Sequence, residues 1–132
     1  MLNAGFSLRV KPAMEIIDTA TLAALRSLQE DGDDDLLAEL IDLFFQDAPE
    51  RISAIGLAVS ASDWERLAER AHSLKGSCAS LGAAQMAALC ARLEAMGRGL
   101  APDADAAEVF AELERQYGLV RLALERERNA TH

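Results

Sequence analysis

One stretch of the chain decides its fold class: residues 62–81, which read SDWERLAERAHSLKGSCASL. Its large apolar residues recur every three or four positions, the spacing that places side chains on one face of an α-helix. These residues are Trp64, Leu67, Leu74, Cys78 and Leu81, with Ala71 between them. Ser62 and Glu65 have the spacing at which two side chains cap the free backbone amides of a helix N-terminus. The stretch therefore predicts an amphipathic helix from Ser62 to about Leu81.

The same spacing predicts helices on both sides of this stretch. They are expected over residues 19–29, 34–46, 49–60 and 84–97, and from a cap at Asp103 or Asp105 to about residue 127. Residues 30–33 (EDGD) interrupt the pattern, and Pro49 is expected to end or kink a helix because proline lacks a backbone amide hydrogen. No strand-like alternation of useful length occurs. We predict an all-α fold: an up-and-down antiparallel four-helix bundle, with an additional N-terminal helix, opening at Asp18, packed at one end.

Length and composition fit a single domain of this kind. The chain has 132 residues, of which 51% are hydrophobic, so it can form one continuous core. Alanine and leucine, both strong helix formers, dominate the composition. We expect residues 1–14 to be an N-terminal tail or linker, residues 15–127 the domain, and residues 128–132 a C-terminal tail.

The charge of the chain excludes several classes of partner. The formal net charge is -9, with 22 acidic and 13 basic residues, so the average field repels nucleic acid and anionic membranes. No apolar run approaches the roughly 18 residues that a membrane-spanning helix needs. Residues 1–13 carry no apolar segment of the kind found in secretion signals. We therefore expect a cytoplasmic protein that binds neither nucleic acid nor membrane.

The two cysteines do not predict a metal site. Cys78 and Cys90 lie in apolar helical segments, and neither belongs to a CxxC pair. With so few ligands, a bound metal is not expected. Two buried thiols are the simplest interpretation, and a disulfide between adjacent helices stays open.

His72 is the residue of chemical interest in the central helix. Each helical residue advances about 100° around the axis, which places His72 roughly 130° from the middle of the apolar seam and thus on the surface. Gly76 lies one turn further along the same face, although glycine inside a helix costs roughly 1 kcal/mol relative to alanine. With Ala68 and Ala79 on either side, Gly76 is expected to leave the space beside the imidazole open. The alternative is that Gly76 permits close helix packing.

Lys75 lies three residues after His72, within side-chain reach on a helix. Its ammonium group could attract a phosphoryl oxygen, or it could be a solvated surface lysine. A neutral imidazole has one ring nitrogen with a free lone pair and can act as a nucleophile. From these residues alone, a surface histidine without a special role also stays open.

A longer motif resembles a known family. The run His72-Ser73-Leu74-Lys75-Gly76-Ser77, followed by Leu81-Gly82-Ala83, is similar to the signature of the histidine-containing phosphotransfer (HPt) domain family. That signature has a histidine, an apolar residue two positions on, then Lys-Gly-Ser and a later Leu-Gly. The resemblance extends from about residue 15 to 125. It includes Ile17-Asp18, Leu43-Phe44 before Pro49, Cys90 followed by Leu93-Glu94, and Tyr117 in the last helix.

The resemblance implies a function and a role for each site residue. His72 would be the phosphoacceptor, most simply at Nε2, with Lys75 stabilising phosphoryl charge and Gly76 giving steric access. The phosphoryl group would pass between aspartates of receiver domains, in response regulators and hybrid sensor histidine kinases, in a multistep two-component phosphorelay. Such a carrier has no autokinase activity and no cofactor of its own, and the Mg²⁺ would be bound by the receiver. We expect a monomer, because one chain can build the whole bundle.

One position departs from the family pattern. Counting equal rises from Gly82, the helix over residues 84–97 passes the level of His72 at residues 91–94. Some family members have glutamine or another neutral polar side chain there, whereas this chain offers Arg92 or Glu94. A carboxylate could hold the ring tautomer but would repel a phosphoryl group. Glu94 and Arg98 are therefore candidates for a supporting role only.

Other readings of the sequence remain. A histidine-kinase dimerisation domain usually has an acidic residue directly after the histidine and a proline soon after it, and neither occurs here. A chemotaxis-kinase phosphotransfer module would share the bundle but would normally be joined to further kinase domains. The alternative from a different class is a non-catalytic helical adaptor that binds receiver or kinase domains. Its surface would be the same exposed face together with Leu43 or Phe45, one of which is expected to be partly exposed.

Overall fold

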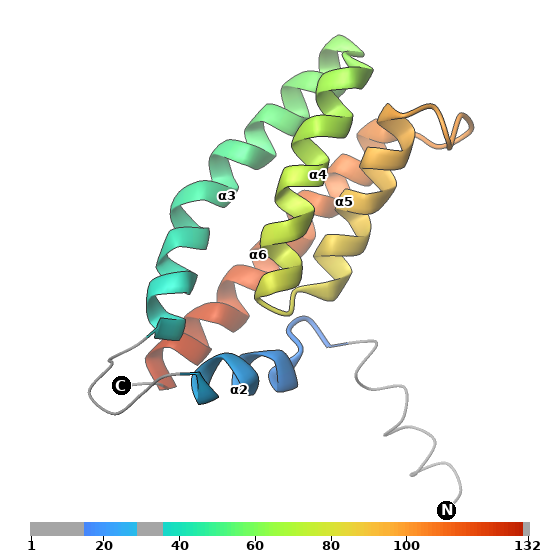
Figure 1. The fold of residues 1–132 in the computed structure, drawn as a ribbon. Helices are drawn as coiled ribbons and strands as arrows, with labels where there is room; N and C mark the ends of the chain where they lie inside the picture. Colours follow the sequence, from blue (N-terminus) through green and yellow to red (C-terminus); the bar gives the residue numbers. More distant parts are fainter. Residues whose placement is uncertain (1–14, 29–35, 131–132) are drawn as a thin grey trace, which may run out of the picture.

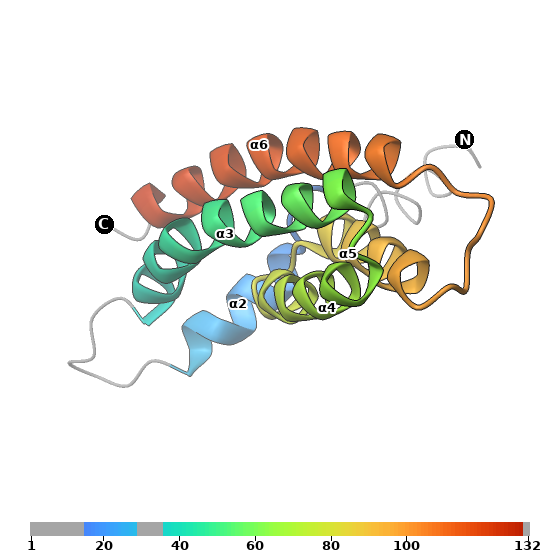
Figure 2. The same cartoon turned by 90° about the horizontal axis from the view of Figure 1, so that it is seen from above.

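The computed structural model describes residues 15–28 and 36–130, and these form five helices (Figure 1). The helices are α2 (Thr19–Ser27), α3 (Leu36–Ala61), α4 (Trp64–Ser80), α5 (Ala84–Gly97) and α6 (Ala106–Ala130). The four long helices run alternately up and down, and each contacts two neighbours in the cyclic order α3, α4, α5, α6. Viewed from above, α3 and α6 form one layer and α4 and α5 the other (Figure 2). The predicted all-α, antiparallel four-helix bundle is confirmed.

The core lies between these two layers. Every long helix contributes side chains that are fully buried, and α2 contributes one, Leu22. The largest fully buried side chains of the bundle are Leu37, Ile41, Ile55, Leu67, Leu74, Cys78, Met86, Leu93, Leu113, Val120 and Leu124. Burying one leucine or isoleucine side chain contributes about 1.5–3 kcal/mol relative to leaving it exposed. The predicted apolar seam of α4 is thus buried from Leu67 onwards, whereas Trp64 lies outside it and is 46% exposed.

Residues 36–61 form one helix, so the possibility that a helix ends at Pro49 is wrong. α3 is a single helix of 26 residues, and Pro49 lies inside it. Ala48 before the proline and Ile52 and Ile55 after it are buried on the same face. Packing of this continuous stripe offsets the hydrogen bond that proline cannot donate.

The start of α4 also differs from the prediction. The N-cap is Asp63, whose carboxylate accepts a hydrogen bond of 3.2 Å from the backbone amide of Arg66. Ser62 instead has a φ of 53° and belongs to the end of α3, where the amide of Asp63 donates to the carbonyl of Ala58 at 2.9 Å. This left-handed residue followed by a 6→1 hydrogen bond is a common way to end a helix. The turn between the helices is therefore shifted by one residue from the position that the Ser62–Glu65 pair suggested.

α2 packs across one end of the bundle, as predicted (Figure 1). Asp18 caps the helix by accepting a hydrogen bond of 3.0 Å from the amide of Ala20. Its own amide donates to the carbonyl of Gly82, in the turn between α4 and α5, at 2.8 Å. Gly82 has a φ of 76°, and a Cβ there would lie 3.0 Å from the carbonyl oxygen of Asp18. At its other end, α2 is joined to α6 by an ion pair of 2.8 Å between Arg26 and Glu127.

The last helix extends beyond the expected boundary at residue 127. α6 continues to Ala130, because Arg128 forms a two-point ion pair with Asp42 of α3, at 2.6 and 3.0 Å. The tail expected over residues 1–14, the interruption at residues 30–33 and the helix start at residue 34 lie outside the described residues. Within the described part of the chain, no helix is long and apolar enough to span a membrane.

Candidate functional site

His72 lies on the outer face of α4. Its side chain is 63% exposed, whereas Ala71 and Leu74 beside it are fully buried. This confirms the outward direction expected from the helical geometry. The surface of the bundle around His72 is formed by α4 and the neighbouring helix α5.

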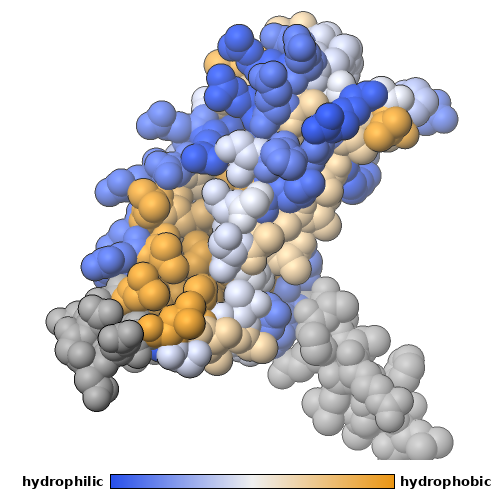
Figure 3. All heavy atoms as spheres, viewed as in Figure 1, coloured by the Kyte–Doolittle hydropathy of each residue, from blue (hydrophilic) through white to orange (hydrophobic). Residues whose placement is uncertain are grey.

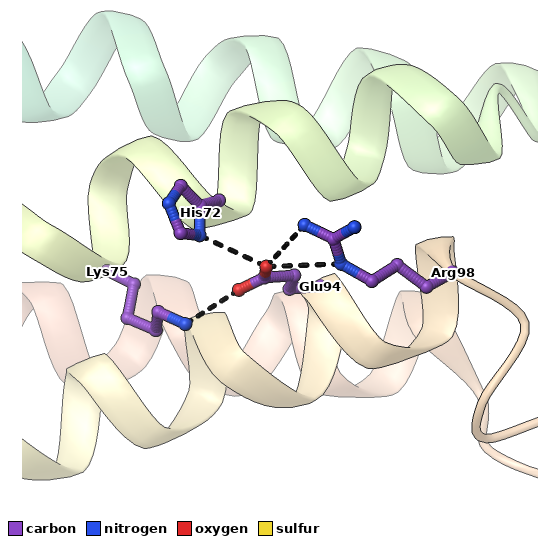
Figure 4. Close-up of polar contacts among 4 residues, drawn as sticks. All are labelled: His72, Lys75, Glu94 and Arg98. Carbon is purple, nitrogen blue, oxygen red and sulfur yellow. Dashed lines mark hydrogen bonds and ion pairs between the residues drawn. The ribbon is translucent and has the colours of Figure 1, made fainter.

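Glu94 of α5 is the centre of a polar cluster on this surface (Figure 4). We call it the Glu94 cluster, and it consists of His72, Lys75, Glu94 and Arg98. The Glu94 side chain is only 11% exposed. Its Oε1 accepts a hydrogen bond of 2.8 Å from Nζ of Lys75. Its Oε2 lies 3.1 Å from Nδ1 of His72 and accepts two hydrogen bonds from Arg98, at 2.7 Å from Nη2 and 3.2 Å from Nε. One buried carboxylate therefore holds three side chains from two helices.

The contact with Glu94 determines which nitrogen of His72 is free. An ionised carboxylate can only accept hydrogen bonds, so Nδ1 must carry the proton that lies between it and Oε2. In the neutral ring, the lone pair is then on Nε2, which points away from Glu94 (Figure 4). The exposed nitrogen of His72 is consequently the nucleophilic one.

The cluster keeps Glu94 ionised. The hydrogen bond from Lys75 is the largest influence and, together with Arg98 and His72, it lowers the pKa of Glu94 to about 2, although burial acts in the opposite direction. Charged donors stabilise a carboxylate more than neutral donors do. Glu94 therefore carries a negative charge throughout the physiological pH range, balanced by two neighbouring cations.

Gly76 lies on open surface beside His72. A Cβ atom built on Gly76 would meet no other atom within 4 Å, so the alternative of close helix packing at this position is wrong. Ala79 is exposed as expected, but Ala68 is buried, which corrects the expectation that it borders the open space. Ala68 is covered by Gly97 of α5, where a Cβ would lie 2.9 Å from that of Ala68. The glycine that permits close helix packing is therefore Gly97.

Of the candidates on or next to α5, the structure brings Glu94 and Arg98 to His72, while Arg92 is exposed. The central place of Glu94 was missed because it depends on how α4 and α5 are aligned. One signal was present in the sequence. Glu94 lies among the apolar residues of its helix, one residue after Leu93 and four after Cys90, and Arg98 follows at the i+4 spacing of a helical ion pair.

The cysteines play no part in this site. Cys78 and Cys90 are both free and buried, as expected of small core residues. A hydrogen bond with Cys90, and then burial, raise the pKa of the Cys78 thiol. Among the described residues, no three His, Cys, Asp or Glu side chains come together as a set of metal ligands.

Comparison with known proteins agrees with this geometry. The model of the Hpt domain family matches residues 39–130. Histidine-containing phosphotransfer protein 2 of Arabidopsis thaliana is 36% identical over 69 residues, which are 50% of this chain and 44% of that protein. Multistep phosphorelay regulator 1 of Schizosaccharomyces pombe is 28% identical over 83 residues, 63% of this chain and 28% of that protein. The chain thus aligns with less than half of each of these two relatives.

A solved structure resembles the whole bundle. The crystal structure of histidine-containing phosphotransfer protein B from Pseudomonas aeruginosa PAO1 matches with a TM-score of 0.76 and 30% sequence identity. The match covers 87% of this chain and 96% of that one. Together with the family model, which matches well over half of the residues, this shows that the chain belongs to the Hpt domain family.

Proposed function

We propose that the protein carries a phosphoryl group on Nε2 of His72 between receiver-domain aspartates in a multistep two-component phosphorelay. The most direct support is that the two ring nitrogens of His72 lie in different environments. Nδ1 is bound to a buried carboxylate, whereas Nε2 is exposed on a surface cleared by Gly76. Membership of the Hpt domain family supports the same role.

The proposed transfer needs no group beyond those at the interface. The lone pair of Nε2 attacks the phosphorus of an aspartyl phosphate, the N–P bond forms, and the P–O bond to the aspartate breaks, releasing its carboxylate. Transfer back to an aspartate reverses these changes. Catalysis of phosphoryl transfer consists mainly of in-line positioning and charge neutralisation. Lys75 can contribute to the second, because its ammonium group has three donors and the hydrogen bond to Glu94 uses one of them.

The partners follow from this chemistry. The phosphoryl donor and acceptor are receiver domains of response regulators and hybrid sensor histidine kinases, and the Mg²⁺ that assists the transfer is bound by the receiver. The protein itself is a carrier without autokinase activity or cofactor. A cytoplasmic location, a monomeric state and the absence of nucleic-acid and membrane partners are parts of the same proposal.

A transfer experiment tests it. The protein is incubated with receiver domains charged with radioactive phosphate, and acid-labile label on the protein is followed with time. His72→Gln is expected to take up no label, whereas His132→Gln, which alters the only other histidine of the sequence, is expected to behave like the native protein. The proposal fails if no receiver labels the native protein, or if His72→Gln is labelled equally.

The adaptor function is a second candidate, favoured by an apolar groove on the surface of the bundle (Figure 3). The groove lies between α2, α3 and α4, and Leu43 is 52% exposed there, while Phe45 is half-buried. The groove is lined by Leu25, Leu40, Leu43, Phe44, Asp47, Ala48, Arg51, Leu74, Ser77, Ser80 and Leu81. Because α4 lines this groove through Leu74 and Ser77 and also carries His72, one receiver could contact both.

Binding and transfer measured together separate the two functions. Leu43→Ser is expected to weaken receiver binding and to slow transfer, because exposed apolar area is removed from the contact. His72→Gln is expected to keep the binding and lose the transfer. Tight receiver binding without any transfer to the native protein would favour the adaptor.

A further inference from the structure

We propose, building on the proposed function, that Asp47 is the residue by which the apolar groove selects its receiver. Asp47 pairs with a lysine or arginine at the edge of an apolar receiver surface that docks in the groove. The occupant is therefore a receiver surface that combines apolar side chains with a cation. Asp47 takes no part in the chemistry at His72, so its role is specificity.

The groove presents an apolar surface to a partner (Figure 3). Leu43 is 52% exposed at the groove, and Leu25 of α2 and Leu40 of α3 are half-buried there. Exposed apolar surface that forms one patch is typical of a protein contact. On α4 the groove is lined by Leu74, which follows His72 by two residues. A receiver docked in the groove therefore contacts the helix that carries the phosphoacceptor.

Among the described residues, the charged side chains that line this groove are Asp47 and Arg51, both of α3. Their spacing of four residues would allow an ion pair along the helix. Arg51 instead reaches across to α4, where its Nη1 donates to Oγ of Ser73 at 2.5 Å. Within residues 15–28 and 36–130, Asp47 has no hydrogen bond or ion pair. The groove thus contains a carboxylate that is free to bind a partner.

The position of Asp47 makes its charge selective. The residue is half-buried and lines the groove together with the buried Phe44 and Ala48. When an apolar surface docks, it displaces water from the carboxylate, and this loss of solvation is offset only if the surface brings an opposite charge. A receiver with an acidic side chain at the same place is repelled. Asp47 therefore both attracts one class of receiver and rejects another, as specificity requires.

Asp47→Asn isolates this charge, because asparagine has the shape of aspartate but is neutral. Glu50→Gln is the matched control. Glu50 is an exposed carboxylate of the same helix that does not line the groove. Both variants remove one negative charge from a chain with a formal net charge of -9. A difference between them consequently reports the position of the charge and not the general attraction of cations to the chain.

The first measurement uses peptides and needs no phosphorylation. Two fluorescent helical peptides of about 18 residues, or five turns, share one leucine face and differ only at its edges, which carry lysine in one and glutamate in the other. The lysine peptide is expected to bind the native protein more tightly. Asp47→Asn should weaken its binding about threefold to tenfold, and Glu50→Gln less than about twofold. Equal effects of the two variants would overturn the inference.

A second pair of variants checks that the peptides occupy the groove. Leu43→Ser removes exposed apolar area from the groove and is expected to weaken the binding of both peptides. Leu57→Ser is its control, because Leu57 is 71% exposed on the same helix but does not line this groove. Binding that is weakened by Leu57→Ser and not by Leu43→Ser would place the contact elsewhere and overturn the inference.

The second measurement uses a receiver domain that labels the native protein. Transfer rates at increasing concentrations of the carrier give the maximal rate and the half-saturating concentration. Asp47→Asn is expected to raise the half-saturating concentration about threefold to tenfold and to keep the maximal rate, whereas Glu50→Gln should change neither. An unchanged half-saturating concentration, or a loss confined to the maximal rate, would overturn the inference and leave the carrier function intact. A native protein that no charged receiver labels would instead remove the carrier function, and the peptides would still decide the preference of the groove.

Charge reversal then identifies the matching residue of the receiver. Surface lysines and arginines of the same receiver are changed to glutamate one at a time, and variants that transfer poorly to the native protein are tested with Asp47→Lys. At least one of them is expected to regain transfer with Asp47→Lys, because the two reversed charges attract again. If no receiver variant is rescued, Asp47 does not pair with a receiver cation and the inference fails.

Discussion

Gly97 of α5 packs directly against the backbone of Ala68 in α4. A Cβ atom on Gly97 would lie 2.7 Å from the amide nitrogen of Ala68 and 2.6 Å from the carbonyl oxygen of Trp64. Ala68 lies one turn before His72, and Gly97 lies three residues after Glu94. This close approach of the two helices therefore brings Glu94 within hydrogen-bond distance of His72.

Gly97→Ala is expected to destabilise the protein and to slow transfer. The added methyl group meets backbone atoms, which cannot move aside as a flexible side chain could, so we expect a loss of about 1–3 kcal/mol of unfolding free energy. Urea denaturation measures this loss. Gly118→Ala is the control: Gly118 lies within α6 with open space around it, and alanine there should stabilise the protein by about 0.5–1 kcal/mol. Equal stability of Gly97→Ala and the native protein would contradict the close approach.

Gly76→Gln is expected to leave the fold intact and to slow phosphoryl transfer by at least about tenfold. Nothing lies within 4 Å of a Cβ at this position, so the side chain can be accommodated, but it will cover the approach to His72. Misplacement of reacting groups by even a small distance can reduce rates by such factors. Transfer from a charged receiver is compared with that of Gly118→Gln, the same substitution at an open glycine of α6. If both variants transfer at the native rate, Gly76 has no role in access.

The stability contributed by Glu94 is expected to disappear in acid. The pKa of Glu94 is lowered to about 2 by Lys75, Arg98 and His72, so its stabilisation is present above about pH 4.5 and is lost as the pH falls toward 2. A lowering of this size corresponds to at most about 3 kcal/mol. The difference in unfolding free energy between the native protein and Glu94→Gln should shrink over that interval. Glu112→Gln is the control, because Glu112 is a partly exposed glutamate of α6 that is also paired with an arginine, Arg115. It should show no comparable change, and a constant difference for Glu94→Gln would contradict the depressed pKa.

Lys75 and Glu94 are expected to be energetically coupled. Lys75→Met removes the ammonium group but keeps most of the apolar side chain, and it leaves the buried carboxylate with one cation fewer. In a double-mutant cycle with Glu94→Gln, we expect a coupling energy of about 1 kcal/mol, modest because a third of the Lys75 side chain is exposed. Urea denaturation of the four proteins gives this value. Additive effects would show that the ion pair contributes nothing measurable.

The two thiols are expected to resist alkylation in the folded protein. Cys78 and Cys90 are buried, and the raised pKa of Cys78 leaves it protonated at any ordinary pH. Iodoacetamide reacts with the thiolate. Mass spectrometry should find both cysteines unmodified in native conditions and both modified in urea. Rapid labelling of the folded protein would show that the interface of α4 and α5 opens readily.

Much of the fold could be predicted because it depends on local spacing. The seam from Leu67 to Leu81 fixes the buried face of α4, and the same spacing identifies α5 and α6. The predicted helix boundaries were wrong where they depend on tertiary packing. α3 continues through Pro49 because side chains before and after it are buried on one face, and Ser62 ends α3 while Asp63 caps α4. The helix preferences of the neighbouring residues do not reveal either outcome.

The sequence by itself determined that the protein is a helical bundle with an outward-facing histidine, since the direction of His72 follows from the turn of a single helix. It also supplied the motif that connects His72, Lys75 and Gly76 with the Hpt domain family. Only the tertiary structure decided that Glu94 binds Nδ1 of His72 and that Lys75 binds Glu94. The reason is that a contact between two helices depends on their separation and relative shift along the axis. Both are set by packing at Gly97 and by the turn at Gly82, which no spacing within one helix reveals.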